Sequence, residues 1–345
     1  MDLLVLGGTA WLGHAVASAA LDAGHRVTCL ARGDDVPAGA DLVRADRDHD
    51  DALAGVTDRS WDAVVDVARQ PGHVRRAVRD LEPVADRYVF VSSVSAYASQ
   101  AELGADERAA LLPPPAADDC AGAYEYGAAK VAGEEAVVAG FGPDRATIVR
   151  PGLIGGPGDP TGRSSWWPAR FARSAVGDSG DVVVAAAADG PDEVLVPLAP
   201  DLPTSMVDVR DLAAWIVRLA TRGPGGAFDA VGTSRPFPEL IDAARRVAGH
   251  DGPVVSAPPE WLLTQGVAQW AGPRSLPLWI AEREAWGMNA RSGAAARAAG
   301  LRLRPLDETL RDALEAERRR PDAEPHGSGL TPAEEAELLA AVPRA

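Results

Sequence analysis

Short runs of apolar residues recur along the first 150 residues of the chain. A continuous apolar run is typical of a strand that is buried on both faces of a sheet. Segments of helical period separate most of the runs, as between Ala15 and Ala23, where Gly24 ends the pattern. Strands that alternate with helices predict a parallel sheet with right-handed crossovers. We therefore expect an α/β fold with a doubly wound parallel sheet, whose first strands would lie at residues 3–6, 27–31, 42–43, 62–68, 88–91 and 147–149.

The pattern loosens after residue 150 and predicts a second, smaller lobe. Glycines and prolines make residues 155–168 a loop, and helical patterns dominate from Pro236 to about Ala316. Thr331-Pro332-Ala333-Glu334 has the cap, the N1 proline and the N3 glutamate of a helix start. We expect a first lobe of residues 1–154 with about 206–235, a mainly helical second lobe of residues 155–205 with 236–318, and a linker with a short tail helix at 319–345.

The composition excludes several classes of partner. The net charge is −16, whereas nucleic acids and anionic membranes bind to basic surfaces. The sequence has no run of 18 apolar residues and no signal-peptide pattern. Its two cysteines, Cys29 and Cys120, have neither metal-ligand spacing nor the pattern of a disulfide framework. We expect a soluble, cytoplasmic protein with no metal, no nucleic-acid partner and no membrane partner.

Among the 34 cationic residues there is a single lysine, Lys130, and all the others are arginines. An ammonium is a compact, titratable charge that arginine does not replace. Lys130 is therefore either required for its chemistry or retained by chance on a surface helix.

A glycine-rich turn lies directly between the first predicted strand and the first predicted helix. Glycines at such a turn allow a tight bend, a close approach of the backbone to a pyrophosphate, and close packing of the helix on the strand. The phosphates would then bind to N–H groups at the helix N-terminus. A purely structural turn is the alternative. The position favours a dinucleotide site of the Rossmann type at Gly7, Thr9, Ala10, Trp11, Leu12 and Gly13.

The end of the second predicted strand indicates which nicotinamide cofactor would bind. A site that prefers NAD usually has an acid there, which holds the ribose hydroxyls. Here Ala31 is followed by Arg32, and arginine can pair with a 2′-phosphate. We expect that NADP(H) is preferred and that NAD(H) can also bind, although Arg32 could be an ordinary surface residue. Asp46 would either bind the adenine amine or cap a turn.

Tyr126 and Lys130 are four residues apart, so on a helix they would lie on the same face. The pKa of a free tyrosine is about 10, and a nearby ammonium lowers it. Tyr126 would thereby become a proton donor and acceptor near neutral pH. Ser92 and Ser93 follow the fifth predicted strand, at the sheet edge where ligands bind, and could donate hydrogen bonds to a substrate carbonyl or merely cap the strand.

Taken together, these motifs resemble the short-chain dehydrogenase/reductase superfamily in its extended, epimerase/dehydratase-like branch. The resemblance covers roughly residues 1–235 and implies that Ser93 is the catalytic serine, Tyr126 the acid/base and Lys130 its partner. The matching segments are Gly7 to Gly13, Ser92 to Tyr97, Tyr126 to Lys130, Arg150-Pro151-Gly152 and Val207 to Leu212.

The same resemblance places further residues near the cofactor. It implies that Ala68 lies along the ribose and phosphates, and that the backbone after Arg150, including Pro151 and Ile154, faces the nicotinamide. Three departures matter. Ala31 replaces the acid of the epimerases that bind NAD tightly, and Val94-Ser95 replaces the Asp-Glu of the sugar-nucleotide dehydratases. Ala10 replaces the middle glycine, which the extended branch tolerates.

We expect an NADPH-dependent reductase, or the reverse dehydrogenase, that acts on a small-molecule carbonyl or hydroxyl substrate. The alternatives are a sugar-nucleotide epimerase with tightly bound NAD and a non-enzymatic dinucleotide sensor. The family resemblance also makes a homodimer one assembly that the chain could form. The second lobe would determine which substrate binds. The predicted substrate contacts are Ser92 and Ser95 of the first lobe and Arg163, Trp166 and Trp167 of the second.

Overall fold

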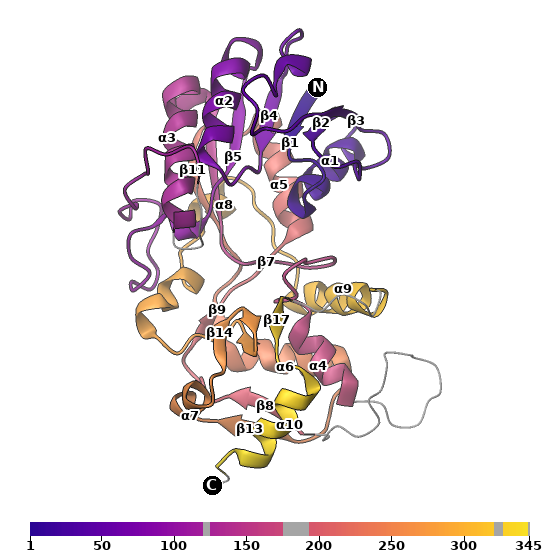
Figure 1. Ribbon diagram of the computed structural model, residues 1–345, viewed down its shortest axis with the longest axis vertical. Helices are drawn as coiled ribbons and strands as arrows, with labels where there is room; N and C mark the ends of the chain where they lie inside the picture. The colour runs from indigo at the N-terminus through magenta and orange to yellow at the C-terminus, as the bar shows by residue number, and fades with distance from the viewer. Residues whose placement is uncertain (120–124, 175–192, 321–326, 344–345) are drawn as a thin grey trace.

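A computed structural model describes residues 1–119, 125–174, 193–320 and 327–343. Cys120 lies outside the described residues. The first lobe is built on a seven-stranded parallel sheet in the order β11-β6-β5-β4-β1-β2-β3, which confirms the doubly wound fold (Figure 1). Its strands are β1 (Asp2–Leu6), β2 (Arg26–Ala31), β3 (Asp41–Arg44), β4 (Ala63–Asp66), β5 (Tyr88–Val91), β6 (Ala146–Pro151) and β11 (Gly226–Ala230).

Helices cover both faces of this sheet, and the alternation of side chains along β1 shows how. Leu3 and Val5 belong to the core beneath α1 (Trp11–Asp22) and α5 (Val209–Arg222). Leu4 and Leu6 belong to the core of the opposite face, beneath α2 (Pro71–Leu81) and α3 (Tyr126–Arg145). A strand buried on both faces needs a continuous apolar run, and for this reason the pattern was visible in the sequence.

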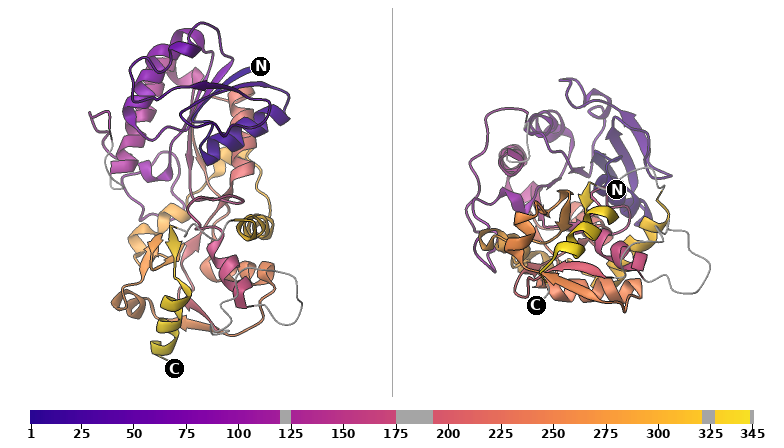
Figure 2. Two further views of the ribbon diagram at one scale, coloured as in Figure 1. Left: turned by 45° about the vertical axis from the view of Figure 1, so that its right-hand side comes forward. Right: turned by 60° about the horizontal axis from the view of Figure 1, so that its bottom comes forward.

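The second lobe combines helices with small strand pairs and has its own apolar core (Figure 2). Its helices are α4 (Trp166–Ser174), α6 (Phe237–Ala248), α7 (Pro259–Thr264), α9 (Leu306–Arg318) and α10 (Pro332–Ala341), and α8 (Ala294–Ala298) packs on the first lobe. Its strand pairs are β8 (Val194–Pro197) with β13 (Val254–Ala257), β14 (Ala268–Trp270) with β16 (Ser275–Pro277), and β15 (Gly272–Pro273) with β17 (Ser328–Gly329).

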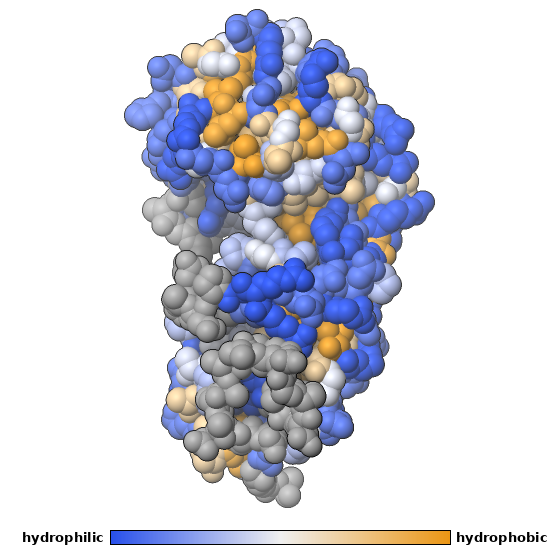
Figure 3. All heavy atoms as spheres, turned by 90° about the vertical axis from the view of Figure 1, so that its right-hand side faces the viewer, coloured by the Kyte–Doolittle hydropathy of each residue, from blue (hydrophilic) through white to orange (hydrophobic). Residues whose placement is uncertain are grey.

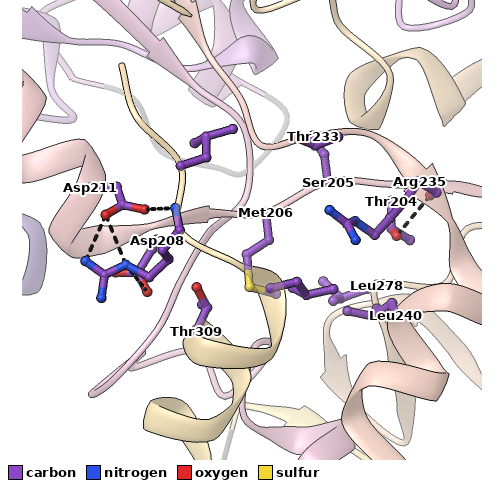
Figure 4. Close-up of a pocket in the computed structure, with 13 residues that line it drawn as sticks. Thr204, Ser205, Met206, Asp208, Asp211, Thr233, Arg235, Leu240, Leu278 and Thr309 are labelled. Atoms are coloured by element: carbon purple, nitrogen blue, oxygen red, sulfur yellow. Dashed lines mark hydrogen bonds and ion pairs between the residues drawn. The ribbon is translucent and has the colours of Figure 1, made fainter. Parts of the chain in front are cut away.

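Two short strand pairs lie between the lobes: β7 (Ile154–Gly155) with β10 (Val207–Asp208), and β9 (Pro203–Thr204) with β12 (Arg235–Pro236) (Figure 1). A cavity of about 30 Å³ lies beside them, and Met206 is one of the residues that line it (Figure 4). Arg304 pairs there with Asp211 at 2.8 Å and lies 3.5 Å from Asp208. This volume holds about two waters, so the cavity is a structural junction and too small for a substrate.

The C-terminal helix α10 is part of the second lobe. Thr331 and Glu334 form a capping box at its start. Glu335 forms a buried ion pair with Arg170 of α4 and accepts a hydrogen bond from the backbone N–H of Leu195 at 3.1 Å. Leu338 and Leu339 belong to the core of the lobe, so the helix is anchored by both apolar and ionic contacts.

The face in Figure 3 carries mostly hydrophilic residues, with apolar patches mainly on the upper lobe. The large hydrophobic side chains that are exposed in the described part of the chain come from separate segments of the sequence. They are Met1, Leu103, Val138, Leu198 and Leu263. Homodimer formation therefore stays a prediction.

Candidate active site

The glycine-rich turn joins β1 to α1 in the geometry of a phosphate-binding loop. Gly7 has a φ of +97°, which favours glycine, and a Cβ at Gly13 would collide with the Gly7 carbonyl. The N-cap residue of α1, Ala10, makes no side-chain capping bond, and the first turn of the helix contains no acid. The N–H groups at the start of α1 thus remain available for an anionic ligand.

A cavity of about 390 Å³ opens beside this turn, between the carboxyl ends of β1 and β4. The strand order reverses at this point, which is where open α/β sheets bind their ligands. The shape and position fit part of a dinucleotide. Its lining includes Gly7, Thr9, Ala10, Arg32, Asp46 and Ala68 from the predicted set, together with Ala31, Gly33, Arg47 and His73.

Arg32 and Asp46 lie together at the rim of this cavity. The Arg32 guanidinium is 3.8 Å from the Asp46 carboxylate, and its side chain is 74% exposed. Asp46 also accepts a hydrogen bond from the backbone N–H of Asp48 at 3.1 Å, as a turn cap does. An exposed arginine with one distant partner can turn toward a ligand phosphate.

Arg47 and Asp66 form a buried ion pair beneath the cavity, which the sequence analysis missed. Two guanidinium nitrogens donate to the Asp66 carboxylate at 2.7 and 2.8 Å, and the Tyr88 hydroxyl donates to it at 2.6 Å. Although burial opposes ionisation of Asp66, Arg47 holds its pKa below the usual range. The one available signal was an acid at the end of an apolar strand.

The remaining predicted cofactor contacts surround the same edge of the sheet. Pro151 ends β6 and is buried, Ile154 begins β7, and Leu12 packs against the core beneath α1. The indole Nε1 of Trp11 donates to the carbonyl of Pro157 at 2.9 Å, which ties the glycine-rich turn to the loop before α4.

Ser93 and Tyr126 come together at the carboxyl end of β5 and the first residue of α3. The Ser93 side chain is close enough to the Tyr126 hydroxyl to act on its pKa. Gly127 allows this approach, because a Cβ there would collide with the Ser95 carbonyl. Burial raises the pKa of the Tyr126 hydroxyl, and Ser93, Arg69 and Arg163 act in the opposite direction.

Lys130 is only 3% exposed, and its contacts differ from those we expected. Its Nζ donates to the carbonyls of Ala68 and Val91 at 2.5 and 2.7 Å and lies 5.7 Å from the Tyr126 ring centroid. Burial lowers the pKa of the ammonium to about 7. Lys130 therefore joins the carboxyl ends of β4 and β5. The prediction that its ammonium lowers the pKa of Tyr126 was wrong, because burial raises that pKa and the groups that oppose the rise are Ser93 and two arginines.

Ser92 faces away from any substrate. Its hydroxyl donates to the Glu134 carboxylate, which forms a buried ion pair with Arg150. Arg150 in turn donates to the Tyr97 hydroxyl at 2.9 Å. The prediction of a substrate contact at Ser92 was wrong, because its side chain is part of this buried network.

Two further predicted substrate residues, Trp166 and Trp167, lie in the core of the second lobe. They open α4 instead of occupying a loop, pack edge-to-face, and are 5% and 1% exposed. Trp167 Nε1 donates to the Pro277 carbonyl at 2.7 Å. Both predictions are corrected, since apolar packing accounts for these side chains.

The last two predicted substrate residues are Arg163 and Ser95. Arg163 is half-buried and acts electrostatically on Tyr126, and Ser95 is half-buried beside Ser93.

The described residues contain no group of three His, Cys, Asp or Glu side chains that could hold a metal ion. In the same part of the chain, no helix combines the length and the apolar character needed to cross a bilayer.

Comparison with known proteins supports the assignment of the glycine-rich turn to a dinucleotide-binding site. Residues 3–87 match the model of the NAD dependent epimerase/dehydratase family. No curated protein matches the chain at a significant level.

Several solved structures share the fold over nearly the whole chain. A candidate epimerase from Burkholderia cenocepacia J2315 is 24% identical with a TM-score of 0.66, and the match covers 92% of this chain and 98% of that one. The Bordetella bronchiseptica enzyme WbmH, solved with NAD+, is 17% identical with a TM-score of 0.59 over 92% and 98% of the two chains. UDP-glucose 4-epimerase from Thermotoga maritima, solved with UDP-glucose, is 16% identical with a TM-score of 0.59 over 92% and 99%. At these identities the likeness shows the fold.

Proposed function

We propose that this chain is an NADP(H)-dependent oxidoreductase of the extended short-chain dehydrogenase/reductase type, acting on a carbonyl or hydroxyl substrate. Its fold and the epimerase/dehydratase match of residues 3–87 support the proposal. One observation carries the proposal. Ser93, Tyr126 and Lys130 meet at the sheet edge that also holds the cavity beside the glycine-rich turn.

Each of these residues has a defined task in such a reaction. A bound nicotinamide supplies a hydride to the substrate carbon, or accepts one from it. The Ser93 hydroxyl orients the carbonyl oxygen, and Tyr126 donates its proton to that oxygen as the alcohol forms. In the reverse direction Tyr126 takes the proton back. Lys130 fixes the strand ends on which Ser93 and the cofactor cavity depend.

The preference for NADP(H) is supported by the end of β2. Ala31 stands where an acid would hold the ribose hydroxyls of NAD, and Arg32 lies next to it on the rim of the cavity. A 2′-phosphate at this rim would offer Arg32 a much closer partner than Asp46 at 3.8 Å.

A sugar-nucleotide epimerase is the second candidate. Residues 3–87 match an epimerase/dehydratase family, and a structural neighbour binds UDP-glucose. Such an enzyme would use the same tyrosine but retain its NAD between turnovers.

The nucleotide content of the freshly purified protein separates the two candidates. We expect an empty site that, once titrated, binds NADPH at least tenfold more tightly than NADH. Arg32→Gln should remove that preference, whereas Arg108→Gln, a change at a 90% exposed arginine paired only with Asp106, should retain it. Copurifying NAD, or a preference that Arg32→Gln leaves intact, would contradict the NADP(H) proposal and favour the epimerase.

A further inference from the structure

Two arginines, one from each lobe, flank Tyr126. Arg69 follows β4, and its guanidinium carbon lies 5.4 Å from the centroid of the Tyr126 ring. Arg163 comes from the loop between β7 and α4, and it is close enough for its charge to act on the Tyr126 hydroxyl. Each lobe thus contributes a positive charge that acts on the proposed acid/base.

Neither guanidinium is neutralised within the described part of the chain, where no carboxylate lies within 4 Å of either one. The acid nearest to Arg163 in sequence, Asp159, acts on the Arg163 charge through space but forms no ion pair with it, and its carboxylate accepts four hydrogen bonds from Thr161 and Ser164. Arg163 itself donates to the Thr161 hydroxyl at 3.0 Å and lies 5.2 Å from the Trp270 ring centroid. These contacts fix the direction of its side chain, and neither of them is an ion pair.

The acids around Tyr126 are likewise committed to other partners. Asp66 is paired with Arg47, and Glu134 with Arg150. The site is therefore locally positive within a chain of net charge −16. Burial lowers the pKa of Arg163, which shows that its charge is partly desolvated and would gain from an anionic partner.

We propose that Arg69 and Arg163 bind an anionic group of the substrate, a carboxylate or a phosphate, next to the carbon that exchanges the hydride. The inference rests on the proposed function and narrows it. The preferred substrates would be 2-oxo acids, 2-hydroxy acids or phosphorylated carbonyl compounds. Guanidinium groups suit such anions because they offer two parallel hydrogen bonds.

Binding can be tested apart from catalysis, with oxalate as the probe. Oxalate should bind to the protein saturated with NADP+, as measured by calorimetry. Arg163→Gln and Arg69→Gln should each weaken that binding at least tenfold, and Arg163→Lys, which keeps the charge without the fork, should weaken it less. Arg108→Gln is the matched control. Circular dichroism and the NADP+ affinity of each variant establish that it is folded.

A second measurement addresses the substrate itself. The rate of NADPH oxidation with benzoylformate should exceed the rate with its methyl ester at least tenfold, and Arg163→Gln should abolish the difference. Because Tyr126→Phe should stop turnover yet retain oxalate binding, failure of the proposed function can be told apart from failure of the anion site. Oxalate binding that is absent, or unchanged in both glutamine variants, would overturn the site. The anion site would also be overturned if Arg69→Gln weakened the binding of NADP+ but not the binding of oxalate, since Arg69 would then bind the cofactor diphosphate.

Discussion

Lys130 is held by two backbone carbonyls, and this environment makes its charge sensitive to pH. Burial lowers the pKa of its ammonium to about 7 from 10.5, against the opposing charge of Asp66. Between these two values the unfolded chain binds a proton that the folded protein does not. Stability therefore rises as the pH rises through this window.

Replacing Lys130 by methionine should remove this dependence in the cofactor-free protein. As the pH rises from about 7 to 10, the wild type should gain unfolding free energy relative to Lys130→Met by up to about 1.4 kcal/mol per unit. Urea denaturation of both proteins at a series of pH values provides the comparison. Parallel curves would show that Lys130 keeps an ordinary pKa in the folded protein.

Local spacing was enough to predict that Tyr126 and Lys130 lie near each other, because a helix places residues four apart on one face. It was not enough to predict the partners of either residue. Arg69 reaches Tyr126 from the end of another strand, and no sequence periodicity links the two. The pairing of Arg47 with Asp66 also depends on how the sheet brings β4 and the chain after β3 together.

At the scale of elements, the strands of the first lobe could be predicted because both faces of the sheet are buried. The start of α4 could not be predicted from the local sequence. Glycines and prolines near residue 160 indicated a loop as far as residue 168, but Trp166 and Trp167 begin a helix, since their side chains fill the core of the second lobe. Long-range packing outweighed the local signal.

The ion pair that anchors α10 gives a prediction at this scale. Glu335→Ala would break the buried ion pair with Arg170 and should lower the unfolding free energy by about 3 kcal/mol. The control is Glu337→Ala on the same helix, whose carboxylate is 67% exposed and 3.4 Å from Arg274, and it should cost less than about 0.5 kcal/mol. Chemical denaturation measures both. Equal losses of unfolding free energy in the two variants would mean that the buried ion pair contributes no more to stability than the exposed one.

At the scale of the whole molecule, the two lobes have separate cores, and the proposed site draws residues from both. The dinucleotide cavity is formed by the first lobe alone. Arg163 and Trp270 belong to the second lobe. A cofactor and an anionic substrate should therefore stabilise different parts of the molecule.

Hydrogen exchange can detect this division. NADPH alone should slow exchange chiefly around residues 7–13, 31–33 and 66–68, which border the cavity. Addition of oxalate to the NADP+ complex should extend the protection to residues 157–164 of the second lobe. Equal protection of both lobes by NADPH alone would contradict the assignment of the two ligands to separate lobes.

The position of the single lysine also has a practical consequence for chemical labelling. A protease that cleaves only after lysine can cut this sequence at one internal peptide bond, which follows Lys130 within α3. Because that lysine is buried, the bond is protected while the helix stays packed. The appearance of two fragments would then report the opening of this one helix. Acylation of the same amine would follow the same event, without any engineered label.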